Sequence, residues 1–204
     1  VEEPSVSYTG FNLVGWYTED SYTNKWDFSN NTVTSNITLY AKWTASDNTQ
    51  YKVKHYKQNI GDDGYPATPS DTDNLQGTTG ADASVTLKNY PGFEAGEYTP
   101  ASIAPDGSTV VEVRYKRRTY SVEFGVNGSN GNIAVTSVTG GVAGGSPITV
   151  KYEGTVNFRA TPTDENSYKV GDWTCTPSEG FTVASGQSSA TLTVTTDTAV
   201  SVQF

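Results

Sequence analysis

The sequence of 204 residues contains very little cysteine, histidine or methionine, and each shortage excludes something. A single cysteine, Cys175, excludes an internal disulfide and any zinc site built on several thiolates. A single histidine, His55, leaves no second imidazole for a zinc site and no thiol neighbour for a catalytic triad. Because there is no methionine at all, the sequence as given does not begin at a start codon, and we expect a piece of a longer protein.

Long apolar runs and a positive charge balance are also missing. No apolar run approaches the ~20 residues that a membrane-spanning helix needs, so no membrane insertion is expected. The 22 acidic and 13 basic residues give a net charge of −9, which disfavours nucleic acids and anionic membranes as partners. A secreted chain of a higher organism would usually carry disulfides. The composition therefore favours an exported bacterial protein.

The residues that are present favour strands. Hydrophobic residues make up only 34 % of the chain, but aromatic residues reach 12 %, which suits small β domains with aromatic cores. Apolar and polar residues alternate in eight stretches, which predicts strands with one buried face and a mainly β fold. Residues 73–87 could hold one short helix or turn segment. The predicted strands are residues 37–43, 51–58, 110–117, 119–124, 148–154, 155–162, 190–196 and 199–204.

Internal similarity divides the chain into three tandem modules. The frame of aromatic and glycine residues in "YTGFNLVGWYT" (8–18) recurs in "YPGFEAGEYTP" (90–100) and in part in "SYKVGDWTCTP" (167–177). We predict modules at 1–46, 47–118 and 119–204, joined by short connections and arranged as an elongated rod. The first module lacks an opening hairpin, so we expect it to begin partway through a repeat.

Three of the four tryptophans, Trp16, Trp26 and Trp43, fall within the first module. A small module gains much from each buried indole, which removes roughly 150–250 Å² from water. We therefore interpret most aromatic residues as core, whereas Trp26, in a polar loop, suits either a core or a surface. The rival interpretation is a flat row of exposed rings that stack on sugars, formed by Trp26, Tyr22 and Tyr17. The predicted aromatic core is Phe11, Trp16, Phe28, Trp43, Phe93, Tyr115, Phe158 and Trp173.

Other candidate chemistry is sparse. The acidic clusters "GDDGY" (61–65) and "SDTDN" (70–74) could offer calcium the oxygens of Asp62, Asp63, Asp71 and Asp73. The spacing of an EF-hand loop is absent, however, and aspartate and glycine are also what turns require. No pair of acids is marked for glycosidase chemistry. We expect no catalytic residue and no cofactor apart from this calcium alternative.

The stretch "GFNLVGWYTEDSYTNKWDFSNNTVTSNITLYAKW" (10–43) resembles the Listeria–Bacteroides repeat, also called the internalin B-repeat. Residues 51–117 are similar to a mucin-binding-like surface repeat, and residues 119–204 resemble a divergent B-repeat. The first resemblance rests on Gly10, Phe11, Gly15, Trp16, Tyr17, Asp27, Phe28, Leu39, Tyr40, Ala41 and Trp43.

The resemblance implies small β-grasp-like modules, with β-sandwich-like packing as a variant, strung along bacterial surface proteins. It implies adhesion or spacing, an extracellular place on the cell surface or cell wall, and no enzymatic activity. The expected partner is a host or cell-surface protein or glycan, met by a monomeric segment of a larger protein. The alternative function is a carbohydrate-binding region of an extracellular glycan-active enzyme.

Overall fold

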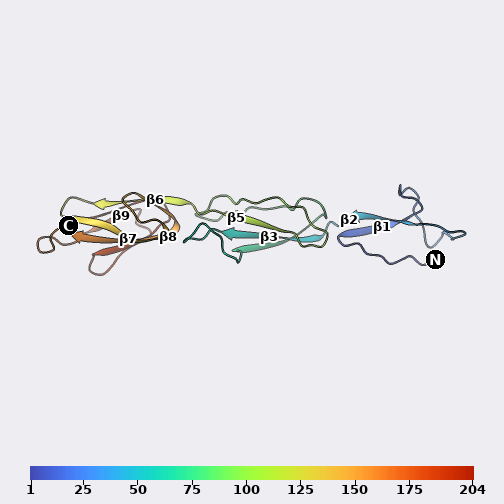
Figure 1. Ribbon diagram of the computed structural model, residues 1–204, viewed down its shortest axis with the longest axis horizontal. Coiled ribbons are helices and arrows are strands. Elements are labelled where there is room, and N and C mark those ends of the chain that lie inside the picture. Colours follow the sequence, from blue (N-terminus) through green and yellow to red (C-terminus); the bar gives the residue numbers. More distant parts are fainter. The chain divides into compact units, whose positions relative to one another are not determined.

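The computed structural model describes residues 1–204 and contains only strands, turns and loops (Figure 1). The predicted mainly β fold class is confirmed. No helix forms within residues 73–87, and the first part of this range belongs to a strand that spans Asp71–Gly77. The strands are β1 (Phe11–Tyr17), β2 (Tyr40–Ala45), β3 (Thr49–Lys57), β4 (Asp71–Gly77), β5 (Val110–Tyr115), β6 (Thr119–Val126), β7 (Gly131–Gly141), β8 (Ile148–Pro162), β9 (Trp173–Thr176), β10 (Phe181–Val183), β11 (Ser189–Thr193) and β12 (Thr198–Val202).

The chain forms two compact units. Unit 1 contains Val1–His55, Ser70–Thr86 and Tyr98–Val113. Unit 2 contains Tyr56–Pro69, Leu87–Glu97 and Arg114–Phe204. The division passes through residues 47–118, and the module boundaries expected from the repeats stay a prediction.

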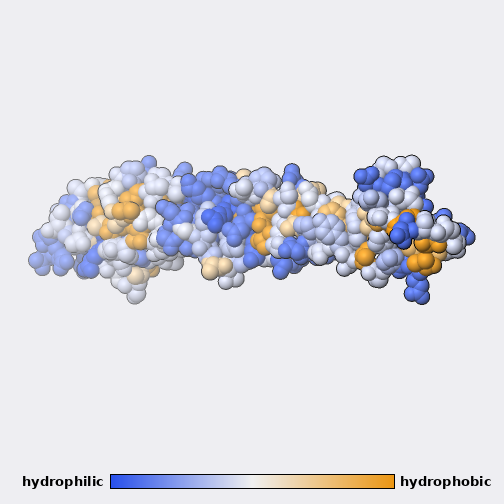
Figure 2. Space-filling model, turned by 45° about the vertical axis from the view of Figure 1, so that its right-hand side comes forward, coloured by the Kyte–Doolittle hydropathy of each residue, from blue (hydrophilic) through white to orange (hydrophobic).

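Within unit 1, β1 and β2 form an antiparallel two-stranded sheet. Leu13 faces Trp43, and after a bulge Trp16 faces Ala41, so these four side chains share one face of the sheet. Little of this region is enclosed: Tyr17 is its one buried apolar side chain between residues 1 and 46. Figure 2 shows apolar atoms at the surface where this region lies, on the right of the view.

A second sheet has the strand order β4-β3-β5, in which β3 and β4 are antiparallel with Tyr51 opposite Leu75. The alternation predicted for residues 51–58 is observed, because Tyr51, Val53 and His55 are buried along β3. His55 is fully enclosed, and its Nε2 lies 3.0 Å from a carboxylate oxygen of Asp73 on β4. The lone histidine is thus a structural strand residue.

The third sheet, in unit 2, has seven strands and curls into a nearly closed barrel. Its path is β10-β11-β8-β6-β12-β9, and β7 pairs with β8 as well. The pair β12–β6 is parallel, and the other pairs are antiparallel. Inward-facing residues enclose one apolar core, made of Val122, Ile133, Ile148, Val150, Val156, Phe158, Ala160, Leu192, Val194, Val200 and Val202.

The long strand β8 covers two of the predicted strands. Residues 148–154 and 155–162 read as separate strands, but they are one strand that changes partner near its middle. Residues 148–151 pair with β6, and residues 155–159 pair with β11. Between these segments, Glu153 has a φ of +63° and its amide donates to the carbonyl of Val194 (2.7 Å).

Candidate functional site: an aromatic pocket in the first module

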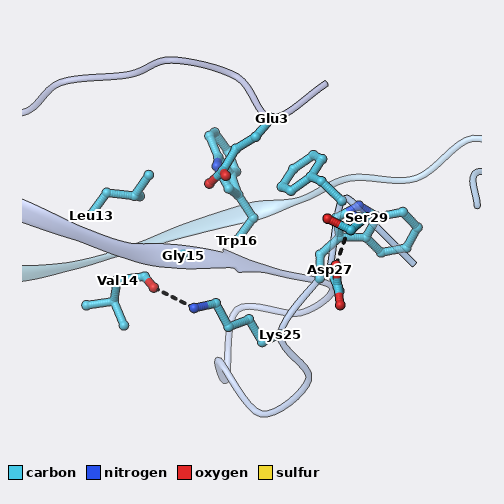
Figure 3. Close-up of a pocket in the computed structure, with 10 residues that line it drawn as sticks. Glu3, Leu13, Val14, Gly15, Trp16, Lys25, Asp27 and Ser29 are labelled. Atoms are coloured by element: carbon cyan, nitrogen blue, oxygen red, sulfur yellow. Dashed lines mark hydrogen bonds between the residues drawn. The ribbon is translucent and has the colours of Figure 1, made fainter. Parts of the chain in front are cut away.

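A pocket of about 450 Å³ opens within residues 1–46, the first of the three predicted modules (Figure 3). One wall is the second half of β1, and the other is the loop that follows the strand. Both walls carry aromatic rings, which give the pocket apolar surface. Charged side chains line it as well. Its lining residues are Glu3, Leu13, Val14, Gly15, Trp16, Lys25, Trp26, Asp27, Phe28 and Ser29.

The loop is fastened to β1 through the space that Gly15 leaves open. Gly15 has a φ of +147°, and a Cβ on it would lie 2.4 Å from Cε of Lys25. The Lys25 stem occupies this space, and its ammonium donates to the carbonyl of Val14 (2.9 Å; Figure 3). In addition, the amide of Trp26 donates to the carbonyl of Trp16 (2.7 Å). Glycine suits this position because its φ is one that side chains rarely adopt and because it leaves room for the Lys25 stem.

The aromatic part of the pocket contains one unused hydrogen-bond donor. The rings of Trp26 and Phe28 meet edge to face, with centroids 6.4 Å apart. The indole N–H of Trp16 is buried and has no acceptor, although the side chain of Glu3 lies beside this ring (Figure 3). A buried donor without a partner costs roughly 1–3 kcal/mol, so a new acceptor at this position would be favourable.

Of the two acids that line the pocket, Glu3 and Asp27, the second stabilises the local turn. The carboxylate of Asp27 accepts hydrogen bonds from the side-chain amide of Asn30 (2.7 Å) and the backbone amide of Ser29 (2.8 Å). The bond from Asn30, and then that from Ser29, hold the pKa of Asp27 below its ordinary value. Because the carboxylate stays ionised and already bonded, it is poorly suited to act as a proton donor.

The three residues expected to form a sugar platform divide into two groups. Tyr17 is buried and meets the ring of Tyr22 edge to face at 5.5 Å, and Lys42 Nζ lies 5.6 and 5.5 Å from their centroids. Trp26 instead lines the pocket with Trp16. Neighbouring residues of a strand point to opposite faces, which places Trp16 and Tyr17 on different sides of β1.

The expected aromatic core differs in burial along the chain. Phe93, Tyr115 and Phe158 are buried. The other members are half-buried: Phe11, Trp16, Phe28, Trp43 and Trp173.

Tyr8 is a residue that the sequence reasoning missed. Its ring stacks on Phe11 at 4.5 Å and meets Trp43 edge to face at 5.7 Å, although Tyr8 itself is 56 % exposed. Only its place in the repeated frame, two residues before Gly10, could have drawn attention to it.

The four aspartates considered for calcium contact other groups. Asp62 accepts hydrogen bonds from the side chain of Asn59 (2.9 Å) and the backbone amide of Gly64 (2.7 Å). Both bonds lower the pKa of Asp62, and the bond from Asn59 has the larger effect. Asp63 lies 3.0 Å from Lys151 Nζ. On β4, Asp71 accepts from the Thr72 amide and Asp73 lies beside His55. No cluster of three or more His, Cys, Asp or Glu side chains could hold a metal ion.

Comparisons with known proteins find a similarity for the N-terminal stretch of the chain. Residues 1–42 match the Listeria-Bacteroides repeat domain, so the predicted resemblance of this stretch is confirmed. A protein of Evansella cellulosilytica named "Putative membrane protein" is 48 % identical over 44 residues, which are 21 % of this chain. The matched stretch is 7 % of that relative's length. A bacterial surface repeat is the class of segment that this match indicates.

None of the structure's segments is a helix with the length and apolar character needed to cross a bilayer.

Proposed function

We propose that this chain is a non-enzymatic segment of a bacterial surface protein that acts as a spacer or adhesion segment toward host or neighbouring cells. The observation that carries the proposal is the match of residues 1–42 to a repeat family typical of bacterial surface proteins. The relative's name, which refers to a membrane protein, supports an extracellular place at the cell envelope.

The absence of enzymatic activity is supported by how the charged groups of the pocket are used. Lys25 donates to the carbonyl of Val14, and Asp27 accepts bonds from two neighbours in its own turn. A general acid or base needs a proton that it can exchange with a substrate. Lys25 and Asp27, two of the three charged residues that line the pocket, instead maintain the backbone of the loop.

The spacer part of the proposal includes a rod of tandem modules, with the mucin-binding-like and divergent B-repeat assignments for the second and third. Residues 46–48 separate β2 from β3, and residues 116–118 separate β5 from β6. Connections this short restrict motion between modules and favour an elongated array. Small-angle X-ray scattering of the whole chain tests this: a maximum dimension well above that of a sphere of equal mass is expected. A compact sphere would contradict the spacer function.

A second candidate function, glycan binding, is favoured by the pocket itself. Trp16, Trp26 and Phe28 supply apolar surface against which a sugar ring can stack, and Lys25 and Asp27 add charged groups beside it. Aromatic surface with a few placed polar groups is the usual make-up of a small-molecule site.

Glycan arrays separate the two candidate functions. Binding of a defined glycan by the whole chain, lost in Trp26→Ala, is the result expected for a sugar site. Tyr168→Ala is the matched control, because it removes an aromatic side chain that is 38 % exposed and belongs to unit 2. If no glycan is retained, or if both variants bind equally, the sugar site is rejected and the spacer function stands alone.

A further inference from the structure

Arg117 lies in the short connection between β5 and β6 and contacts three separate segments of unit 2. Its Nε donates to the carbonyl of Gln58 (2.7 Å). Its Nη1 donates to the carbonyl of Tyr152 (3.0 Å) and to the carboxylate of Glu153 (2.8 Å). The guanidinium carbon also lies 4.7 Å from the ring centroid of Phe93.

We infer that Arg117 is a clamp that fastens the segments Tyr56–Pro69 and Leu87–Glu97 to the seven-stranded sheet, so that they open together with the sheet. The assigned atoms explain why arginine occupies this position. A planar guanidinium presents N–H groups in fixed directions and stacks on an aromatic face at the same time. A lysine ammonium carries the same charge but cannot reproduce this geometry.

The backbone around the clamp reinforces the same connection. The amide of Arg117 donates to the side-chain carbonyl of Gln58 (3.0 Å), and Gln58 is buried. Arg118 donates through Nε to the carbonyl of Phe93 (3.1 Å), and the Tyr152 amide donates to the carbonyl of Arg118 (2.8 Å). Each of these bonds joins one of the two segments, or the sheet, to the connection at 116–118.

The close approach of Gly92 to the sheet depends on this arrangement. Gly92 has a φ of +75°, and a Cβ on it would lie 2.1 Å from the ring of Tyr152. The ring of Phe93 meets Tyr152 at a centroid distance of 6.2 Å. Arg117 therefore holds the segment Leu87–Glu97 at the point where the backbone of Gly92 contacts the ring of Tyr152.

The contacts of Arg117 differ in how much they contribute to stability. Glu153 is half-exposed, with 51 % of its side chain open to solvent, and exposed ion pairs contribute little to stability. The Arg117 side chain is only 11 % exposed, so its bonds to the carbonyls of Gln58 and Tyr152 are shielded from water. Breaking the carbonyl bonds should therefore release the two segments far more than breaking the ion pair.

Hydrogen–deuterium exchange on the whole chain tests the clamp. In Arg117→Ala, the amides of Gln58 and Glu94, which donate to Tyr115 and Lys116, are expected to exchange about ten- to a hundredfold faster. Amides of the β6–β12 pair are expected to keep their rates. Lys116→Ala is the control, because it removes an exposed neighbouring charge without these bonds.

Two further variants keep the clamp falsifiable if Arg117→Ala does not fold. Arg117→Lys keeps the charge and is expected to show the faster exchange at Gln58 and Glu94, whereas Glu153→Gln is expected to change it less than threefold. Wild-type exchange rates in Arg117→Lys, or an equal effect in Lys116→Ala, would overturn the proposal. So would a rise in exchange spread evenly over the β6–β12 pair and the two segments.

Discussion

The first module and the C-terminal sheet use aromatic residues in opposite ways. In residues 1–46, a two-stranded sheet carries Trp16 and Trp43 and the loop between its strands carries Trp26, yet only Tyr17 among the apolar side chains is buried. In unit 2, seven strands enclose eleven core residues, most of them valine, and Phe158 is 1 % exposed. The region richer in tryptophan is thus the region with less enclosed core.

The difference shows that strand number, more than aromatic content, determines how much surface leaves water. A sheet of two strands offers one layer and no opposite wall, so large rings cover one another only in part. Tyr8, Phe11 and Trp43 illustrate this, because they pack in a small cluster while Tyr8 stays largely exposed. The curled sheet of unit 2 supplies walls on every side, and small aliphatic residues suffice.

The largest expected effect comes from truncating one large residue in each region. Phe158→Ala is expected to lower the free energy of unfolding by about 4 kcal/mol, because the ring is fully enclosed beside Phe124 and Trp173. Trp43→Ala should lower it by about 2 kcal/mol, because its ring is half-buried. Urea unfolding followed by circular dichroism measures both. Equal losses in the two variants would break the comparison.

An intermediate effect is expected from two glycines of unit 2 that share a positive φ. Gly92→Ala should lower the free energy of unfolding by about 3 kcal/mol, because the new methyl group would collide with Tyr152. Gly186→Ala is the matched control: its φ is +89° but no atom lies within 4 Å of the new Cβ, so about 1 kcal/mol is expected. Thermal unfolding compares them. A similar loss of stability in both variants would show that backbone strain, and not a collision with the Tyr152 ring, causes the loss at Gly92.

The smallest effect concerns the loop of the first module and its pH dependence. Hydrogen bonds from Asn30 and Ser29 lower the pKa of Asp27 in the folded chain. The stabilisation they provide is complete above the unfolded pKa of about 4, and it is lost as the pH falls through the folded pKa.

An NMR titration of the Ser29 and Asn30 amides measures the loss of these hydrogen bonds in acid. We expect their chemical shifts to change only in acid below the ordinary carboxyl range, and the change to disappear in Asp27→Asn, whose side chain does not ionise. A titration at the ordinary aspartate pKa would contradict the role assigned to these hydrogen bonds.

Period-two alternation located strands well where one face is buried. Residues 51–58 and 110–117 correspond to β3 and β5, and residues 199–204 to β12. β7 was not predicted, because Gly131–Gly141 mixes small and polar residues and its inward positions are recognisable only beside β8. The change of partner within β8 was missed for the same reason, since alternation continues across the bend.

The candidate site was predicted only in part. The sequence drew attention to Trp16, Trp26 and Phe28, because large aromatic residues are conspicuous in a small module. It did not indicate that Lys25 would lie in the space above Gly15, or that Tyr17 and Trp26 would belong to different groups of rings. These relations depend on the bulge in β1, which alternation does not reveal.

The sequence by itself determined the mainly β character of the chain, the positions of most strands and the resemblance of the N-terminal stretch to a repeat family, because side-chain periodicity and the glycine–aromatic spacing are local properties. Only the tertiary structure decided which rings are enclosed and which carbonyls Arg117 reaches. Burial and long-range hydrogen bonds depend on segments that are distant in sequence, and only the folded chain brings these segments together.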